Sequence, residues 1–291
     1  MRAGVPLALL ALCLAAPSRA NAVPDFSGIW ARTTFGYDLA GSGPGALKNL
    51  ARRPNGTSDA FKLVGDYNNP ILQPWAAAIV KQHGAISLAG KSYPDLSNEC
   101  RPLPPPYVLR IAQMQMLQEK DHIIILYIQD HQFRQVRLNA THPANVAPSW
   151  NGDSVGHYEG DTLIIDTVGI RTRPGSMIDM YGTPHTPALH VVERYRLVDG
   201  EMAKRAQERS EREYGRPTTE PVYVDADYRG KGLQVEFTVE DSGTFTRSWS
   251  SAVAYRRSSV TEWGEIACAE NTRDYYAGAT ATVPTAERPD F

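Results

Sequence analysis

The stretch Ser154-Val-Gly-His-Tyr-Glu-Gly-Asp-Thr-Leu-Ile-Ile-Asp-Thr-Val168 decides the fold. Its centre, Tyr158-Glu-Gly-Asp161, predicts a tight turn. The residues on either side predict two short strands, Ser154–Tyr158 and Thr162–Val168, because apolar and polar side chains alternate along them. A β-hairpin is therefore expected at the middle of the chain.

Further strands are expected on both sides of this hairpin. Their ranges are Phe26–Arg32, Met114–Glu119, Ile123–Gln129, Phe133–Leu138, His190–Leu197, Leu233–Val239, Thr244–Arg256 and Glu262–Cys268. Helical spacing appears in Asn68–Gly84, and the charge-dense segment Asp199–Tyr214 carries opposite charges four residues apart, as exposed helices do. Many antiparallel strands joined by short turns predict a mainly β fold, one antiparallel β-barrel with a few decorating helices and long loops.

The expected domain organisation is simple. Residues 1–22 resemble a signal peptide, because Arg2 precedes the apolar run Val5–Ala16 and Ala20-Asn-Ala22 offers small residues for cleavage. An exported protein, periplasmic or secreted, is expected. The remaining 23–291 predict a single barrel-type domain, with 99–200 and 230–270 as its β-rich core and 201–216 as an inserted exposed helix.

Composition and absent motifs exclude several function classes. The 291 residues include 30 Lys and Arg against 32 Asp and Glu, without a clustered basic stripe, so nucleic-acid binding is not expected. No later stretch approaches the roughly 18 apolar residues of a membrane span. Glycine-rich dinucleotide and phosphate-binding motifs and the serine nucleophile elbow are all missing, so no cofactor is expected.

Two cysteines, Cys100 and Cys268, remain after signal cleavage. An oxidising compartment makes a long-range disulfide between them the expected arrangement, and two buried free thiols are the alternative. Neither cysteine has a neighbouring Cys or His at ligand spacing, so a structural zinc site is not expected.

Two resemblances bear on the fold. Phe26-Ser-Gly-Ile-Trp30, followed by Arg32, resembles the Gly-x-Trp opening of lipocalin-like barrels, in which the tryptophan plugs the closed end. Longer stretches, including the Tyr-Glu-Gly-Asp-Thr-Leu hairpin, are similar to a broad set of secreted bacterial proteins of unassigned function: Asp130-His-Gln-Phe-Arg134, Gly156-His-Tyr-Glu-Gly-Asp-Thr-Leu-Ile-Ile-Asp166-Thr, Pro184-His-Thr-Pro-Ala-Leu-His-Val-Val-Glu-Arg-Tyr195 and Cys268-Ala-Glu-Asn271. The resemblance implies a lipocalin-like barrel and brings no mechanism. Where those proteins often have Gly-His-Ser-Val-Gly, this chain has Asp153 in place of the histidine.

A first candidate site is Asp130-His131, with Arg134 three residues on. A carboxylate beside an imidazole orients it and raises its basicity, as a general base requires. His131 is then the expected base, oriented by Asp130, and Arg134 would stabilise developing negative charge. The alternative is a polar strand end in which Arg134 bridges Asp130 at the surface.

A second candidate group contains His185, His190 and Glu193, preceded by Tyr181 in the long loop Arg171–Pro187, which resembles a barrel-mouth lid. His190 is the expected general acid, and the others are expected to bind substrate. Because this segment predicts a strand, its spacing is not that of a helical zinc motif, and no metal site is expected. Buried histidines bonded to backbone carbonyls are the structural alternative.

Three further residues complete the expected substrate site. His142 lies in a Thr-His-Pro turn that we place at the barrel rim, and Asp166 is expected to face inward, opposite His131. Arg194 either stabilises negative charge or forms a structural ion pair with Glu193.

Two functions follow from these groups. The first is an exported, cofactor-independent acid–base enzyme, a lyase, isomerase or hydrolase, that acts on a small hydrophobic or aromatic molecule in a barrel cavity. The alternative is a lipocalin-like protein that binds or transports such a ligand without catalysis. Convergence of at least two of these groups in one cavity, with carboxylates behind them, favours the enzyme, and scattered histidines favour the binding protein. The groups are Asp130, His131, His142, His185 and His190.

Overall fold

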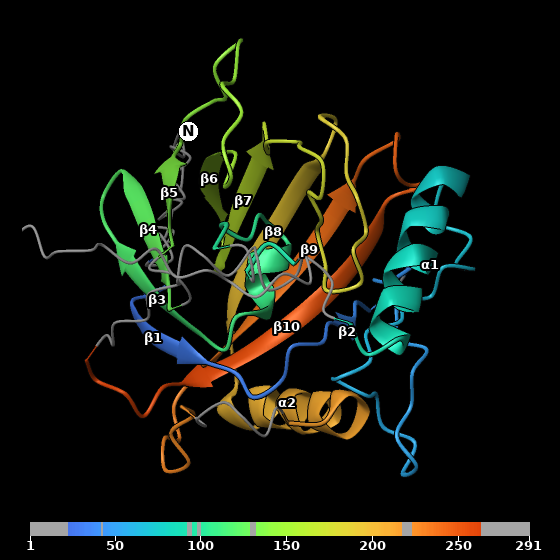
Figure 1. Ribbon diagram of the computed structural model, residues 1–291. Coiled ribbons are helices and arrows are strands. Elements are labelled where there is room, and N and C mark those ends of the chain that lie inside the picture. Colours follow the sequence, from blue (N-terminus) through green and yellow to red (C-terminus); the bar gives the residue numbers. More distant parts are fainter. Residues whose placement is uncertain are drawn as a thin grey trace, which may run out of the picture.

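The computed structural model describes residues 23–41, 43–91, 95–97, 100–128, 132–216 and 223–262. Its strands are β1 (Gly28–Ala31), β2 (Asp38–Leu39), β3 (Gln113–Gln118), β4 (His122–Tyr127), β5 (Phe133–Leu138), β6 (Asp153–Glu159), β7 (Thr162–Val168), β8 (His190–Val198), β9 (Gly232–Glu240) and β10 (Trp249–Arg257). Within the described ranges, nine strands close into a β-barrel because β1 pairs with both β3 and β10, while β2 adds to β10 (Figure 1).

The expected hairpin is confirmed. Strands β6 and β7 pair along their whole length, from Asp153 opposite Val168 to Glu159 opposite Thr162, and the turn lies between them. The predicted strand that would follow β10, Glu262–Cys268, falls almost entirely outside the described residues, as do the signal-peptide segment 1–22 and Cys268.

The barrel is not purely antiparallel, which corrects the expectation. β5 and β6 run parallel, with Val136 opposite Ser154 and Leu138 opposite Gly156. Parallel neighbours need a connection long enough to bring the chain back to the end at which the first strand began. Segment 139–152 provides that connection.

Two α-helices flank the barrel in the described part of the chain. α1 (Pro74–Leu88) begins later than the spacing indicates, because Pro74 occupies its first turn, where a missing N–H is tolerated. α2 (Gly200–Tyr214) is capped by Asp199 and lies across one end of the barrel (Figure 1). It is exposed on one face only, since Gln207 is buried and donates to the backbone carbonyls of Ala31 and Ala254. Neither helix has a run of apolar residues long enough to cross a bilayer.

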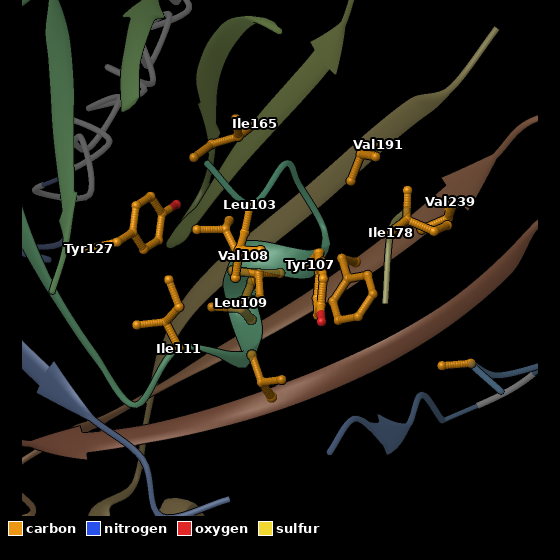
Figure 2. Close-up of a cluster of buried hydrophobic side chains, with 14 of the residues drawn as sticks. Leu103, Tyr107, Val108, Leu109, Ile111, Tyr127, Ile165, Ile178, Val191 and Val239 are labelled. Carbon is orange, nitrogen blue, oxygen red and sulfur yellow. The ribbon is translucent and has the colours of Figure 1, made fainter. Parts of the chain in front are cut away.

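The centre of the barrel is filled by the chain itself. The segment that includes the short 3-10 helix η1 (Tyr107–Arg110) enters the barrel, and Leu103, Val108 and Leu109 are no more than 1% exposed. They pack in one apolar cluster with inward-facing side chains of the strands, among them Tyr127, Ile165, Val191 and Val239 (Figure 2). A packed core therefore occupies the position where the sequence analysis expected a ligand cavity.

Candidate functional site

Two histidines meet at one carboxylate on the outer wall of the barrel. The Nε2 atoms of His142 and His190 lie 3.1 Å and 3.0 Å from the same oxygen, Oδ1 of Asp166. His142 comes from the connection between β5 and β6, Asp166 from β7, and His190 from the first position of β8. Residues far apart in sequence thus form one imidazole–carboxylate–imidazole group.

Each imidazole has a second carboxylate behind it. Nδ1 of His142 lies 2.6 Å from Asp153, which also accepts two hydrogen bonds from Arg137, at 2.8 and 2.9 Å. Nδ1 of His190 lies 3.4 Å from Glu240, a longer and weaker contact. We refer to these six residues as the wall site: Arg137, His142, Asp153, Asp166, His190 and Glu240.

Strand register explains why the wall site forms. Asp166 is directly opposite Val155 on one side and Val192 on the other, and His190 is opposite Glu240. Side chains alternate between the two faces of a strand, so these groups share the outer face.

Asp166 therefore does not point into the barrel as expected. Its neighbours Ile165 and Thr167 are fully buried, whereas the Asp166 side chain is 37% exposed. The alternation along β7 was predicted, but the core takes the face that carries Leu163 and Ile165 because burying those apolar side chains is more favourable.

The wall site alternates positive and negative groups. The hydrogen bond that His190 donates to Asp166 raises the pKa of His190, and burial opposes that rise. In return, the hydrogen bond with His190 lowers the pKa of Asp166, with a smaller contribution from His142. Both ring nitrogens of His142 face carboxylate oxygens, Nδ1 that of Asp153 and Nε2 that of Asp166.

Metal binding was not expected at these residues. In the described ranges, no group of three or more His, Cys, Asp or Glu side chains is arranged to hold a metal ion. The nitrogen–oxygen distances in the wall site are those of hydrogen bonds, and we interpret the group as one that shares and exchanges protons.

Arg134 and Glu193 lie inside the barrel, on the opposite side of the wall. They form a buried ion pair, and the guanidinium also donates to Ser154 and Thr167. Arg134 is therefore not at the surface as the alternative expected, while its expected partner Asp130 lies outside the described residues. Glu193 pairs with Arg134 instead of Arg194. Arg194 is exposed on the outer face of β8, because adjacent residues of a strand point to opposite sides.

His185 and Tyr181 do not join the wall site. Both are buried, and burial lowers the pKa of His185, whose Nδ1 contacts the carbonyl of Thr186. This is the structural alternative considered for a buried histidine. Tyr181 instead lines a separate pocket that also contains His83.

Some of the expected site residues lie outside the part of the chain that the structure describes, and some residues of the wall site were not predicted from the sequence. Asp130 and His131 are outside the described residues, so the role of this pair as base and orienting group stays a prediction, as does the Cys100–Cys268 disulfide. Sequence reasoning missed Arg137, Asp153 and Glu240, whose signal is a charged residue at the end of a strand.

The comparisons with known proteins do not assign this chain to a family. No family model, no curated protein and no solved structure matches this chain. The resemblance to secreted bacterial proteins stays a prediction.

Proposed function

We propose that this protein is an exported, cofactor-independent enzyme that uses acid–base chemistry, and that the wall site is its catalytic centre. The observation that carries the proposal is the convergence of two imidazoles on one oxygen of Asp166, each with a second carboxylate behind it. Histidine is suited to this chemistry because its pKa lies near neutral pH and responds to neighbouring carboxylates.

His190 is the proposed catalytic acid and base. Asp166 accepts a hydrogen bond from Nε2 of His190, which fixes the ring orientation and leaves Nδ1 as the atom that exchanges a proton with substrate. Nδ1 has only the long contact to Glu240 to give up when a substrate arrives. Because the hydrogen bond to Asp166 raises the pKa of His190, the protonated ring that acts as the acid is favoured relative to a free histidine.

His142 is the proposed positioning residue. Its Nε2 atom contacts the same oxygen of Asp166, Oδ1, that His190 contacts, while its Nδ1 atom contacts Asp153. Arg137 in turn fixes Asp153 through two hydrogen bonds from one nitrogen. This succession of contacts restricts the carboxylate to the orientation that His190 needs.

A small hydrophobic or aromatic molecule remains the proposed substrate. Val155 and Val192 flank Asp166 on the outer face, so apolar side chains border the polar groups. The chemistry is that of a lyase, isomerase or hydrolase, since proton transfer by imidazole serves each of them. The alternative, a carrier with its ligand at the barrel centre, is less well supported because apolar side chains of the chain fill that space.

A lipocalin-like architecture is part of the proposal. Trp30 is fully buried near the start of the barrel, and its indole nitrogen donates to the carbonyl of Phe26. A tryptophan that closes one end of a lipocalin-like barrel would occupy such a position.

Untargeted metabolite profiling tests the proposed function. The purified mature protein is incubated with a hydrophobic and aromatic extract, in parallel with the variants His190→Gln and His157→Gln. His157 is the matched control, an exposed histidine of β6 that contacts only Glu159 among the interactions described for it. We expect a compound to disappear with the wild type and with His157→Gln, and to persist with His190→Gln. If the wild type consumes nothing, or if His190→Gln consumes the same compound equally fast, the proposal is wrong.

A further inference from the structure

A cluster of positive charge lies just beyond the end of β7. The guanidinium carbons of Arg171 and Arg173 lie 6.0 Å and 5.7 Å from the centroid of the same aromatic ring, that of Trp150. A guanidinium within about 6 Å of an indole centroid is attracted by the ring. The two arginines belong to the connection between β7 and β8, and the tryptophan belongs to the connection between β5 and β6. We call these three residues the arginine patch.

Backbone contacts hold the two connections together. The N–H of Ser149 donates to the carbonyl of Gly169, and the N–H of Arg171 donates to the carbonyl of Ser149. The guanidinium of Arg171 adds two contacts, from Nε and Nη2 to the carbonyl of Pro148, at 3.3 and 3.0 Å. The Trp150 ring is half-buried and packs against the hydrophobic core. The ring is therefore held in place beside both guanidinium groups.

A tight turn sets the spacing of the two arginines. The turn Arg173-Pro-Gly-Ser176 has proline at its second position and Gly175 at its third, with a φ of 81°, which is the pattern of a type II turn. The N–H of Ser176 closes the turn on the carbonyl of Arg173. The hydroxyl of Ser176 accepts from the N–H of Arg173 and donates to the carbonyl of Arg171, at 2.9 and 3.4 Å. The local sequence therefore fixes the backbone that carries both arginines.

The arginine patch is not neutralised by acidic side chains in the described part of the chain. Neither guanidinium forms an ion pair there, and the exposed guanidinium of Arg173 makes no hydrogen bond. The connection 139–152 contains no acidic residue, and 169–189 contains only Asp179. That carboxyl group is 5% exposed and accepts its hydrogen bonds from its own loop. Two positive charges therefore remain unbalanced around one ring.

Two guanidinium groups beside one ring match the charge and shape of a phosphate monoester. A guanidinium is planar, and its N–H groups form a fork that donates to phosphate oxygens in pairs. A phosphate monoester carries a charge of about −1.5 to −2 at pH 7 and three acceptor oxygens, so one such group can satisfy two arginines. Among the contacts described for these residues, Nη1 of Arg171 and all the guanidinium nitrogens of Arg173 have no hydrogen-bond acceptor. These nitrogens are the donors that a phosphate would engage.

We propose that the arginine patch binds a phosphate monoester group, with the phosphate oxygens shared between Arg171 and Arg173. The proposal depends on this patch alone. It holds whether the wall site is catalytic or not, because none of the three residues of the patch belongs to the wall site. Phosphate monoesters occur both as small soluble molecules and as lipid headgroups, and the experiment has an arm for each source.

Isothermal titration calorimetry with three single-ring probes is the first arm. Phenyl phosphate, benzoate and benzylamine share a ring and differ in the charged group. We expect phenyl phosphate to bind to the full mature protein at least tenfold more tightly than benzoate or benzylamine, and its affinity to fall as salt is added. Benzoate or benzylamine binding as tightly as phenyl phosphate would overturn the proposal.

Co-sedimentation with phosphatidylcholine vesicles, with and without phosphatidic acid, is the second arm. Binding of phenyl phosphate without co-sedimentation assigns a soluble ligand to the patch. Co-sedimentation that requires phosphatidic acid assigns the lipid headgroup. The absence of binding in both arms would overturn the proposal.

Variants locate the binding. Arg171→Gln and Arg173→Gln each remove one cation, so each is expected to weaken phosphate binding at least tenfold in the arm that detects it. Arg196→Gln is the matched control, because this exposed arginine of β8 lies opposite Thr162, at the other end of β7 from the patch. Circular dichroism establishes that each variant is folded. Unchanged affinity in the folded Arg173→Gln protein would overturn the assignment. His190→Gln is expected to bind phosphate as the wild type does, so the failure of the proposed catalytic function has no bearing on this site.

Discussion

The side chains of Arg134 and Glu193 are 1% and 0% exposed and form an ion pair inside the barrel. A buried charge is tolerated only when it is paired and hydrogen-bonded. The carboxylate meets this condition by accepting from the hydroxyl of Tyr195 as well, and the guanidinium by donating to Ser154 and Thr167. The pair links β5 to β8 from within the barrel.

Removing one charge of this pair is expected to destabilise the fold strongly. Glu193→Gln leaves the guanidinium buried without its counter-charge, which we expect to lower the free energy of unfolding by roughly 3–5 kcal/mol. Glu159→Gln, at the exposed hairpin turn, is the control and should stay within about 0.5 kcal/mol of the wild type. Urea unfolding measures both. A loss below about 1 kcal/mol for Glu193→Gln would show that the pair is not important for stability.

At the residue scale, sequence reasoning predicted which side chains share a face but not which face is inside. The alternation that puts Thr162, Ile164 and Asp166 together holds in the structure. The convergence of His142 with His190 depends on the parallel placement of β6 beside β5, which no local pattern encodes. Local periodicity therefore predicts the individual strands, whereas the wall site depends on the order in which the strands lie side by side in the barrel.

The pairing of β5 with β6 is parallel, unlike the other strand pairs described for the barrel. Its register covers only the pairs from Val136 to Leu138, fewer than the neighbouring β6–β7 pair. Polar contacts of the wall site cross this seam, because Arg137 of β5 binds Asp153 of β6 and His142 comes from the connection between the two strands. The wall site therefore also helps to hold the barrel closed.

The stability that His190 contributes is expected to depend on pH. Its pKa is raised above the value of about 6.5 in an unfolded chain, so this contribution is fully present below that pH and is lost as pH rises through the folded pKa. The lowered pKa of Asp166 has the opposite sign: its contribution is present above about pH 4 and is lost as pH falls through its folded pKa.

Urea unfolding of the wild type and of His190→Gln measures this dependence. The difference in unfolding free energy between the two proteins should be larger near about pH 5.5 than near about pH 8.5. A difference that is constant, or that grows toward alkaline pH, would contradict the proposed coupling between His190 and Asp166.

The whole molecule is a closed barrel whose interior is filled by its own chain. In the structure, the proline-rich run from Arg101 to Tyr107 is neither α-helix nor strand. Its position inside the barrel was not predicted, because apolar spacing in so short a segment does not indicate what the segment packs against. The closed β architecture itself was predicted, since many short strands of similar spacing allow few other arrangements.

Shortening a side chain of this internal segment is expected to cost much stability. Leu109 is fully buried at the barrel centre, so Leu109→Ala should lower the free energy of unfolding by roughly 2–5 kcal/mol. Leu117→Ala is the control, because this leucine of β3 is 40% exposed and should cost less than about 1 kcal/mol. Equal costs in urea unfolding would argue against a packed centre.

The central claim is that Asp166 tunes His190 as an acid–base group, and the titration of the His190 ring by nuclear magnetic resonance tests it most directly. The claim predicts a pKa above 6.5 for His190 in the wild type, a lower pKa in Asp166→Asn, and an unchanged pKa in the control Glu159→Gln. A pKa at or below 6.5 in the wild type, or no change in Asp166→Asn, would contradict the claim.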